Sequence, residues 1–470
     1  MRYDEHAGRI DEPSLVGGWV IEEMRQKQAD GRRRRMLSRL RIASGVASVA
    51  ALFALGLWTS AAWGKLFGVI RLPASESTIT TGRELFEHRW VRDDERAGGD
   101  GLGPVFNADS CAACHFQGGL GGAGTNEHNI TAFEVAAIGP RRSIDAGVIH
   151  ASAVDLPFRE SLEDVTALHP PVRLRFNGTC NNIYTTEVSP VRTFTLSTPA
   201  LFGVGLIDRI TGIELGVRTV ARQVEAAKAD FELDFDYTSP GRLRLLENGV
   251  GKFGWKAQFA TLEDFVANAC AGEIGLSNPS YAQATPREFS SDEEAAHDLS
   301  SHQVRAIAEF CRSLPRPEQV LPETPAKRTA VAGGTALFAE VGCTDCHTPE
   351  VGGIEGIYTD FRLHRVDEQY DVTYRTSLDD NTPFNHPADD AWKTTPLWGV
   401  ADSGPYWHDG SEPTLDDAIL RHGGEATRVI ERYRALGPKR LAVVAFLETL
   451  KAPRLPESGP PTAMLATLPR

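Results

Sequence analysis

The residues with the most specific chemistry in this 470-residue chain are Cys111, Cys114 and His115. On a helical turn, positions i, i+3 and i+4 share one face, so both thiols can reach the edge of a flat cofactor while the imidazole reaches its metal. The spacing is typical of c-type haem attachment, in which two thioethers hold the porphyrin and the histidine binds iron. A structural zinc half-site and a redox Cys-x-x-Cys pair are the alternatives.

The same pattern occurs a second time, at Cys343, Cys346 and His347. A zinc site needs four ligands close together, and neither zinc nor a redox pair explains a histidine directly after each cysteine pair. The two copies therefore predict two covalently bound haem c groups, each in its own domain. Calcium is a further cofactor that stays open, since no motif assigns it.

The composition is that of a globular protein with an acidic body. Residues 1–70 hold 11 Lys and Arg against 7 Asp and Glu, which leaves 38 against 56 and a net charge of −18 for the other 400 residues. An acidic body disfavours nucleic acid as a partner and suits a small basic redox protein or a membrane electron donor. A solvated surface without a charged partner is the alternative.

Three cysteines lie outside the haem motifs, at Cys180, Cys270 and Cys311. At most one intrachain disulfide can form among them. A Cys270 to Cys311 bridge and three unbonded thiols both remain open.

The first 64 residues favour a membrane anchor. Residues 1–41 are a basic segment with six arginines between Arg32 and Arg41, and residues 42–64 are 23 positions without a charge, long enough to span a bilayer. Basic residues on the N-terminal side keep that end in the cytoplasm. We therefore expect a single-pass inner-membrane protein with its haem domains in the periplasm. A signal peptide cleaved near Ser60-Ala61-Ala62 is the alternative.

The remaining chain is predicted to be mainly α-helical, with two cytochrome-c-like haem domains and an insertion containing some β structure. The predicted parts are a tether at 65–78, a first domain at 79–314 with its insertion at about 129–190, a linker at 315–332, a second domain at 333–452 and a disordered tail at 453–470. Helical periodicity is found at 81–90, 213–228, 261–273 and 300–314. Four prolines within 315–325 mark the linker.

A glycine-rich stretch follows the first motif, from Gly118 to Gly124. It contains a formal GxGxxG pattern, but no strand precedes it, so a dinucleotide site is not expected. We interpret the glycines as positions where backbone passes close to a bulky cofactor.

Three pairs of segments indicate that one haem module was duplicated. They are Gly82 to Phe86 with Gly334 to Phe338, Thr198 to Val204 with Thr394 to Val400, and Gly251 to Asp264 with Gly404 to Asp417. The third pair superposes Trp255 on His408 and Ala269 on His422. The halves therefore share a scaffold but differ at selected polar positions.

Methionine is excluded as the distal ligand of either haem. The four methionines lie at Met1, Met24, Met36 and Met464, outside the haem domains. Histidine is then the leading candidate for a sixth ligand. The second haem has four candidates, His364, His386, His408 and His422, and the first has His128, which is either a labile ligand or none. His422 is preferred because it closes a helical run and precedes Gly423-Gly424.

The sequence resembles the di-haem oxidoreductase family, which is related to bacterial di-haem cytochrome c peroxidases and the methylamine-utilisation di-haem enzyme. The resemblance covers residues 80–452 and rests on both haem motifs and on three further runs. These runs are Gly101 to Asn107, Thr198 to Gly205 and Tyr406 to Glu425.

The resemblance also implies roles for single residues. In the peroxidases a Trp lies between the haems, ten residues before a Gln, with a catalytic Glu ten further along. Trp255 matches the Trp, Phe265 stands where the relatives have Gln, and Glu273 lies two residues short of the Glu position. A distal histidine fourteen residues after a His-Asp-Gly histidine corresponds to His422, counted from His408.

The resulting hypothesis is a membrane-anchored periplasmic electron-transfer protein with peroxidase-like activity at its first haem. His115, His347 and His422 would bind iron, and Glu273 and Trp255 would serve catalysis, with a small oxidant such as peroxide as substrate. A non-catalytic, membrane-tethered electron carrier and an oxidase of an organic or thiol substrate are the alternatives.

Overall fold

The computed structural model describes residues 74–135, 145–154, 162–177, 183–216, 241–283, 296–366 and 391–454. All of them belong to one compact unit, Leu66–Arg470. The predicted anchor at 42–64 and the tail beyond residue 454 lie outside the described residues. Among the ranges given above, no helix combines the length and apolar character that crossing a membrane requires.

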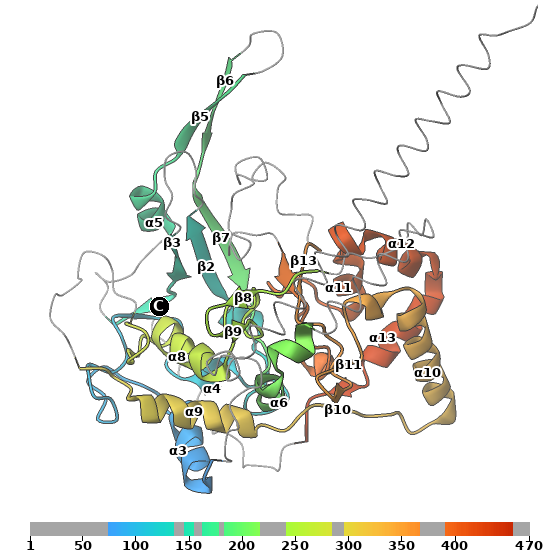
Figure 1. Cartoon of the computed structure of the whole chain (residues 1–470), viewed down its shortest axis with the longest axis horizontal. Helices are drawn as coiled ribbons and strands as arrows, with labels where there is room; N and C mark the ends of the chain where they lie inside the picture. The colour runs from blue at the N-terminus through green and yellow to red at the C-terminus, as the bar shows by residue number, and fades with distance from the viewer. Residues whose placement is uncertain are drawn as a thin grey trace, which may run out of the picture. The chain divides into compact units, whose positions relative to one another are not determined.

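The described part of the chain is a mainly helical body with small antiparallel sheets (Figure 1). The helices are α3 (Glu76–Glu87), α4 (Cys111–Cys114), α5 (Leu162–Leu168), α6 (Val204–Arg209), α8 (Leu262–Glu273), α9 (Ser301–Ser313), α10 (Pro325–Glu340), α11 (Leu415–Arg421), α12 (Thr427–Ala435) and α13 (Leu441–Leu447). Short 3-10 turns are η1 (Asn126–His128), η4 (Cys343–Asp345), η6 (Val400–Asp402), η7 (Gly424–Ala426) and η8 (Gly437–Arg440).

The predicted insertion holds the longest strands. A three-stranded sheet has the order β3 (Asp145–Ile149), β2 (Ile130–Val135) and β7 (Val191–Leu196), and β5 (Val172–Asn177) pairs with β6 (Ile183–Val188) in a hairpin (Figure 1). The other strands form two-residue pairs: β1 (Val105–Phe106) with β4 (Ser152–Ala153), β8 (Leu245–Leu246) with β9 (Gly249–Val250), β10 (Glu318–Gln319) with β15 (Leu450–Lys451), β11 (Glu350–Val351) with β12 (Ile354–Glu355), and β13 (Leu363–His364) with β14 (Trp392–Lys393).

Most predicted helices are present, with changed ends. The periods at 261–273 and 300–314 coincide with α8 and α9, which begin at capping residues Thr261 and Ser300. The period at 81–90 corresponds to α3, which starts earlier because the Ser75 side chain accepts a hydrogen bond from the Thr78 amide. A helix is also predicted at 213–228. Residues 212–216 are helical, and residues 217–228 lie outside the described residues.

Two of the predicted connecting segments are partly helical. Residues 76–78 of the tether belong to α3. Residues 325–332 of the linker belong to α10, because Pro325 stands in its first turn, where a missing amide costs no helical hydrogen bond. The connection between α9 and α10 is therefore 314–324, and its strand β10 pairs with β15 at the end of the second haem domain.

The duplication is visible as two equivalent helix crossings, α3 on α9 and α10 on α13. A Cβ added at Gly82 would collide with the Ala306 carbonyl, and one added at Gly334 would collide with the Ala442 carbonyl. Only glycine lets the two backbones approach this closely. The crossing brings Phe86 within 5.1 Å of Phe310 and Phe338 within 5.4 Å of Phe446, ring centre to ring centre.

The hydrophobic core is shared between the two halves of the chain. The larger cluster contains residues of α3, α6, α8 and α9 together with Val351, Ile357, Phe361 and Trp398 from the second half. A smaller cluster joins α10, α11, α12 and α13. Because side chains from both halves of the chain share this core, both haem motifs belong to one packed unit.

The crossing glycines give a stability prediction within one helix. Gly334→Ala should lower the free energy of unfolding by about 1–3 kcal/mol, because its methyl group would overlap the Ala442 carbonyl. Gly333→Ala, the adjacent position with open space, should raise it by about 0.5–1 kcal/mol. Urea unfolding followed by circular dichroism measures both. Equal effects at the two positions would contradict the crossing geometry.

Candidate functional site

The first haem motif lies on a single helical turn, α4. The Ser110 hydroxyl accepts a hydrogen bond from the Ala113 amide at 3.1 Å and starts this turn. Nδ1 of His115 donates to the Gly122 carbonyl at 3.2 Å, which leaves the lone pair of the neutral ring on Nε2. Burial lowers the pKa of His115 to about 4, so the ring is neutral at pH 7. This is the form that binds iron.

The glycine-rich loop folds back over this motif. A Cβ at Gly122 would collide with the Gln117 carbonyl, and one at Gly124 would lie 2.7 Å from the Cys114 carbonyl. Gly122 and Gly124 are therefore required by contact with the chain's own backbone. Their effect is to aim the Gly122 carbonyl at His115.

The second motif repeats the same arrangement on the 3-10 turn η4. Nδ1 of His347 donates to the Tyr358 carbonyl at 3.1 Å. Burial, with the neighbouring charge of His422 as the next cause, lowers the pKa of His347 to about 4. The ring centres of Phe338 and His347 lie 6.4 Å apart, and those of Phe86 and His115 lie 6.0 Å apart. Each crossing helix thus supports its own motif histidine.

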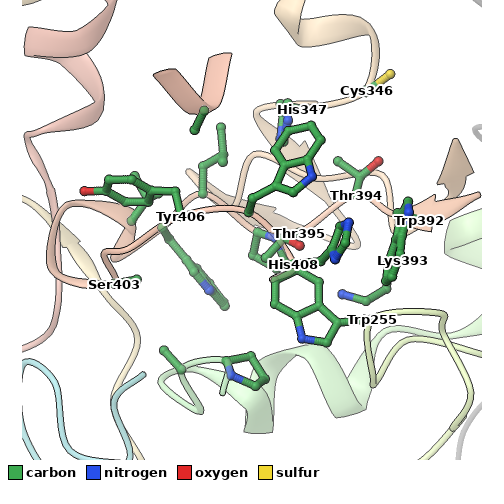
Figure 2. Close-up of a pocket in the computed structure, with 18 of the residues that line it drawn as sticks. Trp255, Cys346, His347, Trp392, Lys393, Thr394, Thr395, Ser403, Tyr406 and His408 are labelled. Carbon is green, nitrogen blue, oxygen red and sulfur yellow. The ribbon is translucent and has the colours of Figure 1, made fainter. Parts of the chain in front are cut away.

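A cavity of about 340 Å³ opens beside the second motif (Figure 2). Its wall is mainly apolar and includes Cys343, Cys346, His347 and His422. Trp255 and segments of the first half complete it. This size and lining are typical of sites for cofactors and small molecules. Two thiols and two imidazoles on one apolar cavity are the donor set that a covalently attached haem requires.

His422 ends helix α11 and lines this cavity. Its Nδ1 donates to the Ala418 carbonyl at 2.9 Å, which places the lone pair of the neutral ring on Nε2, as in both motif histidines. Its ring lies edge-on to Trp407, with ring centres 4.6 Å apart. The geometry agrees with a distal ligand at His422.

His408 has a different environment, although it lines the same cavity. Its ring stacks on Trp392 with centres 3.6 Å apart and an interplanar angle of 7°. Trp407 and Trp255 lie further away, with ring centres at 6.1 and 6.4 Å. Figure 2 shows the rings of His408, Trp392 and Trp255 grouped on one side of the cavity. The stacking agrees with a position that flanks the haem. Trp392 carried no signal in the sequence, because its partner lies sixteen residues away on another segment.

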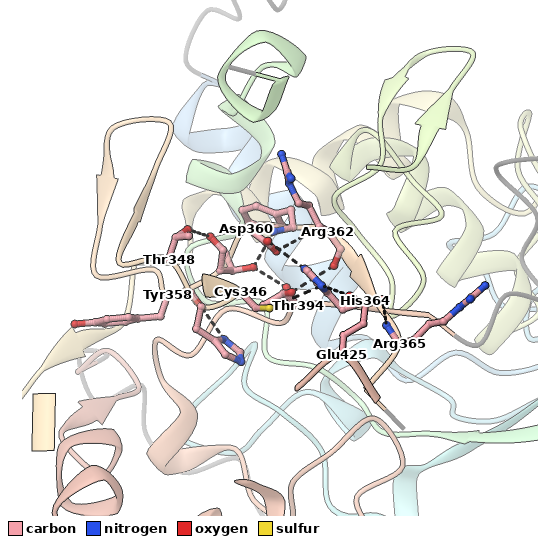
Figure 3. A network of polar contacts seen from close by, with 12 residues as sticks. Cys346, Thr348, Tyr358, Asp360, Arg362, His364, Arg365, Thr394 and Glu425 are labelled. Atoms are coloured by element: carbon pink, nitrogen blue, oxygen red, sulfur yellow. Dashed lines mark hydrogen bonds and ion pairs between the residues drawn. The ribbon is translucent and has the colours of Figure 1, made fainter. Parts of the chain in front are cut away.

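His364 belongs to a buried polar network (Figure 3). Its Nδ1 lies 2.9 Å from a Glu425 carboxylate oxygen and its Nε2 lies 3.2 Å from an Asp360 carboxylate oxygen. Burial lowers its pKa, but Cys346, Asp360 and Glu425 outweigh burial and raise the pKa well above the usual value. Both ring nitrogens of His364 face carboxylates, which disfavours this candidate as an iron ligand relative to His422.

The network of His364 also fixes the loop after His422. The Gly423 amide donates to the Val366 carbonyl at 2.7 Å, and the Glu425 amide donates to the Arg365 carbonyl at 2.8 Å. His386, another sequence candidate, lies outside the described residues. His128 lies in η1, with its ring edge-on to Phe116 at 5.4 Å.

Trp255 lies between the cavity and the first motif. Its indole Nε1 donates to the Ser197 carbonyl at 2.9 Å. Two residues further on, the Pro199 carbonyl interacts with His115. Trp255 also contacts His408 and lines the cavity that contains His347. One indole thus has contacts that lead toward both motif histidines.

Glu273 lies at the last turn of α8 and close to the first motif. Burial, followed by the charge of Glu273, raises the pKa of Cys114. Asn107 donates to its Oε2 at 2.7 Å, and burial raises the pKa of Glu273 to about 7. Ala269 lies four residues before Glu273, so the two share one face of α8. Phe265 stacks on Phe253 with ring centres 6.1 Å apart, so the position of the relatives' Gln is apolar here.

No disulfide joins Cys270 and Cys311, and the described residues form no metal cluster. Cys270 and Cys311 are buried free thiols on α8 and α9, and Cys180 lies outside the described residues. In the ranges that the structure describes, no three His, Cys, Asp or Glu side chains are arranged to hold a metal ion. Calcium therefore stays a prediction without an assigned site.

Comparison with known proteins decides the family. A family model described as "Di-haem oxidoreductase, putative peroxidase" matches residues 181–450, more than half of the chain. The chain belongs to this family. Cytochrome c551 peroxidase of Nitrosomonas europaea is 26% identical over 203 residues, which are 40% of this chain. The chain spans 57% of the length of that relative.

Two solved structures are similar at low identity. Hydrazine synthase of Kuenenia stuttgartiensis is 14% identical with a TM-score of 0.38, over 82% of this chain and 90% of that one. A MauG-like protein associated with microbial copper homeostasis is 14% identical with a TM-score of 0.35, over 82% and 91%. The family assignment makes this chain a di-haem oxidoreductase with a cytochrome-like fold of helices and some sheet. Both motifs fit its two haems, since each presents two thiols and a neutral, oriented imidazole.

Replacing the two cavity histidines tests which one is the distal ligand. In oxidised holoprotein, His422→Ala should convert the second haem from low-spin to high-spin, because a strong-field ligand is lost. His408→Ala should leave it low-spin, because the His408 ring stacks on Trp392 and His422 would still be present as the ligand. Optical and electron paramagnetic resonance spectra measure both. The reverse result would exchange the two roles.

Proposed function

We propose that this di-haem oxidoreductase reduces a small peroxide at its first haem with electrons that enter through its second haem. One observation supports this above all others. The two modules hold their motif histidines in the same way, but the repeat places Ala269 where the second module has His422. A methyl group cannot bind iron, whereas an imidazole can.

Covalent attachment at both motifs is part of the proposal. Cys111 and Cys114 of the first motif, and Cys343 and Cys346 of the second, would form the thioethers, with His115 and His347 as proximal ligands. When bound, the haems supply iron centres that store and pass single electrons and activate an oxidant. The protein's part is to orient the ligands, exclude water and handle protons.

The second module is suited to electron transfer. His347 and His422 would both ligate, and each ring is fixed through Nδ1 by a backbone carbonyl. Fixed ligands keep the coordination unchanged between redox states, which lowers reorganisation. Trp255 would bridge the modules through its contacts with His408 and Ser197. The electron donor would be a small basic redox protein or a membrane donor that matches the acidic body.

The first module would provide the proton chemistry. Reduction of hydrogen peroxide breaks its O–O bond, consumes two electrons and two protons, and forms two waters. Two one-electron donors supply the electrons, and water supplies the protons. Glu273, with its pKa near 7, can take a proton from one peroxide oxygen and return it to the departing oxygen. The name of the relative from Nitrosomonas europaea, cytochrome c551 peroxidase, agrees with this reaction.

The departure at Phe265 favours one alternative, a non-catalytic electron carrier. The peroxidases that this family resembles have Gln at this position, and here the side chain stacks within an aromatic cluster. Peroxide turnover then depends on Glu273 alone among the polar groups carried over from the relatives.

We also propose that residues 42–64 anchor the protein in the inner membrane with both haem domains in the periplasm. The uncharged run and the arginines before it support this topology. The protein should fractionate with membranes and its haem domains should be cleaved by protease added to the periplasmic side. Recovery of a soluble mature chain that starts near Trp63 would contradict the anchor.

Glu273→Gln should lower peroxide turnover by about 10²–10⁴-fold while both haems stay attached, because the amide cannot exchange the proton. In the wild-type protein kcat/KM should fall as the pH drops below about 7, where the carboxyl becomes protonated. The pH profile of Glu273→Gln should lack this fall in kcat/KM below about pH 7. Stopped-flow oxidation of a reduced basic cytochrome c by hydrogen peroxide measures both.

Glu263→Gln is the matched control on the same helix. Its carboxylate lies in the first turn of α8, at the opposite end from Glu273, and pairs with Arg305 at 3.6 Å, so turnover should be unchanged. Unaltered turnover in Glu273→Gln would remove Glu273 from the reaction.

A further inference from the structure

A closed ring of hydrogen bonds includes the side-chain carboxylate of Glu273. Asn107 donates from Nδ2 to Oε2 of Glu273 at 2.7 Å and accepts at Oδ1 from the Ala151 amide at 2.9 Å. His150 donates from Nε2 to the Gly272 carbonyl at 2.9 Å. Since Ala151 follows His150 and Glu273 follows Gly272, the ring closes through the backbone. It joins three segments far apart in the sequence.

The ring fixes which end of the Asn107 amide faces Glu273. The Ala151 amide can only donate, so it selects the carbonyl oxygen of the Asn107 side chain and directs the NH₂ group to the carboxylate. The main chain adds a second constraint, because the amides of Asn107 and Ala108 donate to the Glu273 carbonyl at 2.7 and 3.3 Å. A rotation of Asn107 would break both side-chain bonds at once.

His150 stabilises the turn whose next residue, Ala151, donates a hydrogen bond to Asn107. Its side chain is 4% exposed, and burial lowers its pKa, so the ring is neutral with its proton on Nε2. Its Nδ1 is buried and has no hydrogen-bond partner in the described part of the chain. An apolar side chain would avoid the penalty of this unpaired nitrogen but could not bind the Gly272 carbonyl.

We propose that Asn107 is the positioning residue of Glu273, held by the His150-Ala151 turn so that the carboxyl group presents Oε1 to the substrate. This rests on the proposed role of Glu273 in proton transfer. Oε2 is occupied by the Asn107 donor, and Oε1 takes no hydrogen bond from the described part of the chain. One oxygen is thus fixed for orientation and the other is left for exchange.

The same hydrogen bond sets the proton affinity of Glu273. Burial favours the neutral carboxyl, and the Asn107 donor favours the carboxylate, so the pKa stays near 7 and not higher. A group with this pKa can both take and return a proton near neutral pH. Loss of the donor should therefore raise the pKa and reduce the fraction of enzyme that is ready to accept a proton.

Asn107→Asp tests the donor while keeping the fold. Aspartate has nearly the same shape and still accepts from the Ala151 amide, but it offers Glu273 an acceptor and a like charge. The acidic limb of the kcat/KM profile should move up by about one pH unit or more, which at pH 7 is roughly a fivefold loss of turnover. Asn107→Ala should move it in the same direction. In oxidised holoprotein, infrared titration of the carboxyl band that Glu273→Gln removes should show the same shift without turnover.

Asn278→Ala is the matched control. Asn278 is 1% exposed and its amide also braces α8, by donating to the Ala267 carbonyl at 2.8 Å. This variant should be less stable but keep the wild-type midpoint. Wild-type midpoints in both Asn107 variants would overturn the positioning role, while a loss of turnover in Glu273→Gln would still support the proposed function. If Glu273→Gln keeps its turnover, the proposed function fails, and the infrared titration alone decides the inference.

Discussion

The close backbone contact of a glycine with a carbonyl on a crossing helix is the constraint on which both modules depend. Gly82 meets α9 and Gly334 meets α13, and no other residue fits at either crossing. Each crossing places a phenylalanine beside the motif histidine of the same module, with ring centres 6.0 Å apart in the first module and 6.4 Å apart in the second. Both motif histidines are half-buried and neutral, and a backbone carbonyl orients each ring, which is the state that iron ligation requires.

The two haem modules share one scaffold, so the positions at which they differ indicate where their functions differ. Thr261 and Thr414 cap equivalent helices in the same way, yet the first helix continues to Glu273 and the second ends at His422. Trp255 and His408 occupy matching positions and contact each other across the two halves. One module has an imidazole, His422, and the other has a half-buried carboxyl group, Glu273, at a different position of the repeat. In the proposed function, these two differences would divide electron transfer and proton transfer between the modules.

The sequence predicted what depends on local spacing. Both attachment motifs, the capped helices α8 and α9, the strand-rich insertion and the duplicated glycines could be found because their residues lie within one turn or repeat at a fixed offset. It did not predict contacts between side chains on different segments. The spacing gives no sign that Glu425 contacts His364 or that the Asn107 amide donates to Glu273. The linker at 315–332 overlaps α10 because proline is favoured in a first helical turn as well as in linkers.

The proposed function requires the two haems to differ in coordination, because Ala269 stands where the second module has His422. An electron paramagnetic resonance spectrum of the fully oxidised, haem-loaded protein measures this difference. One high-spin and one low-spin ferric signal in equal amounts are expected. Two low-spin signals without high-spin iron would contradict the proposed peroxide site and would identify the protein as an electron carrier.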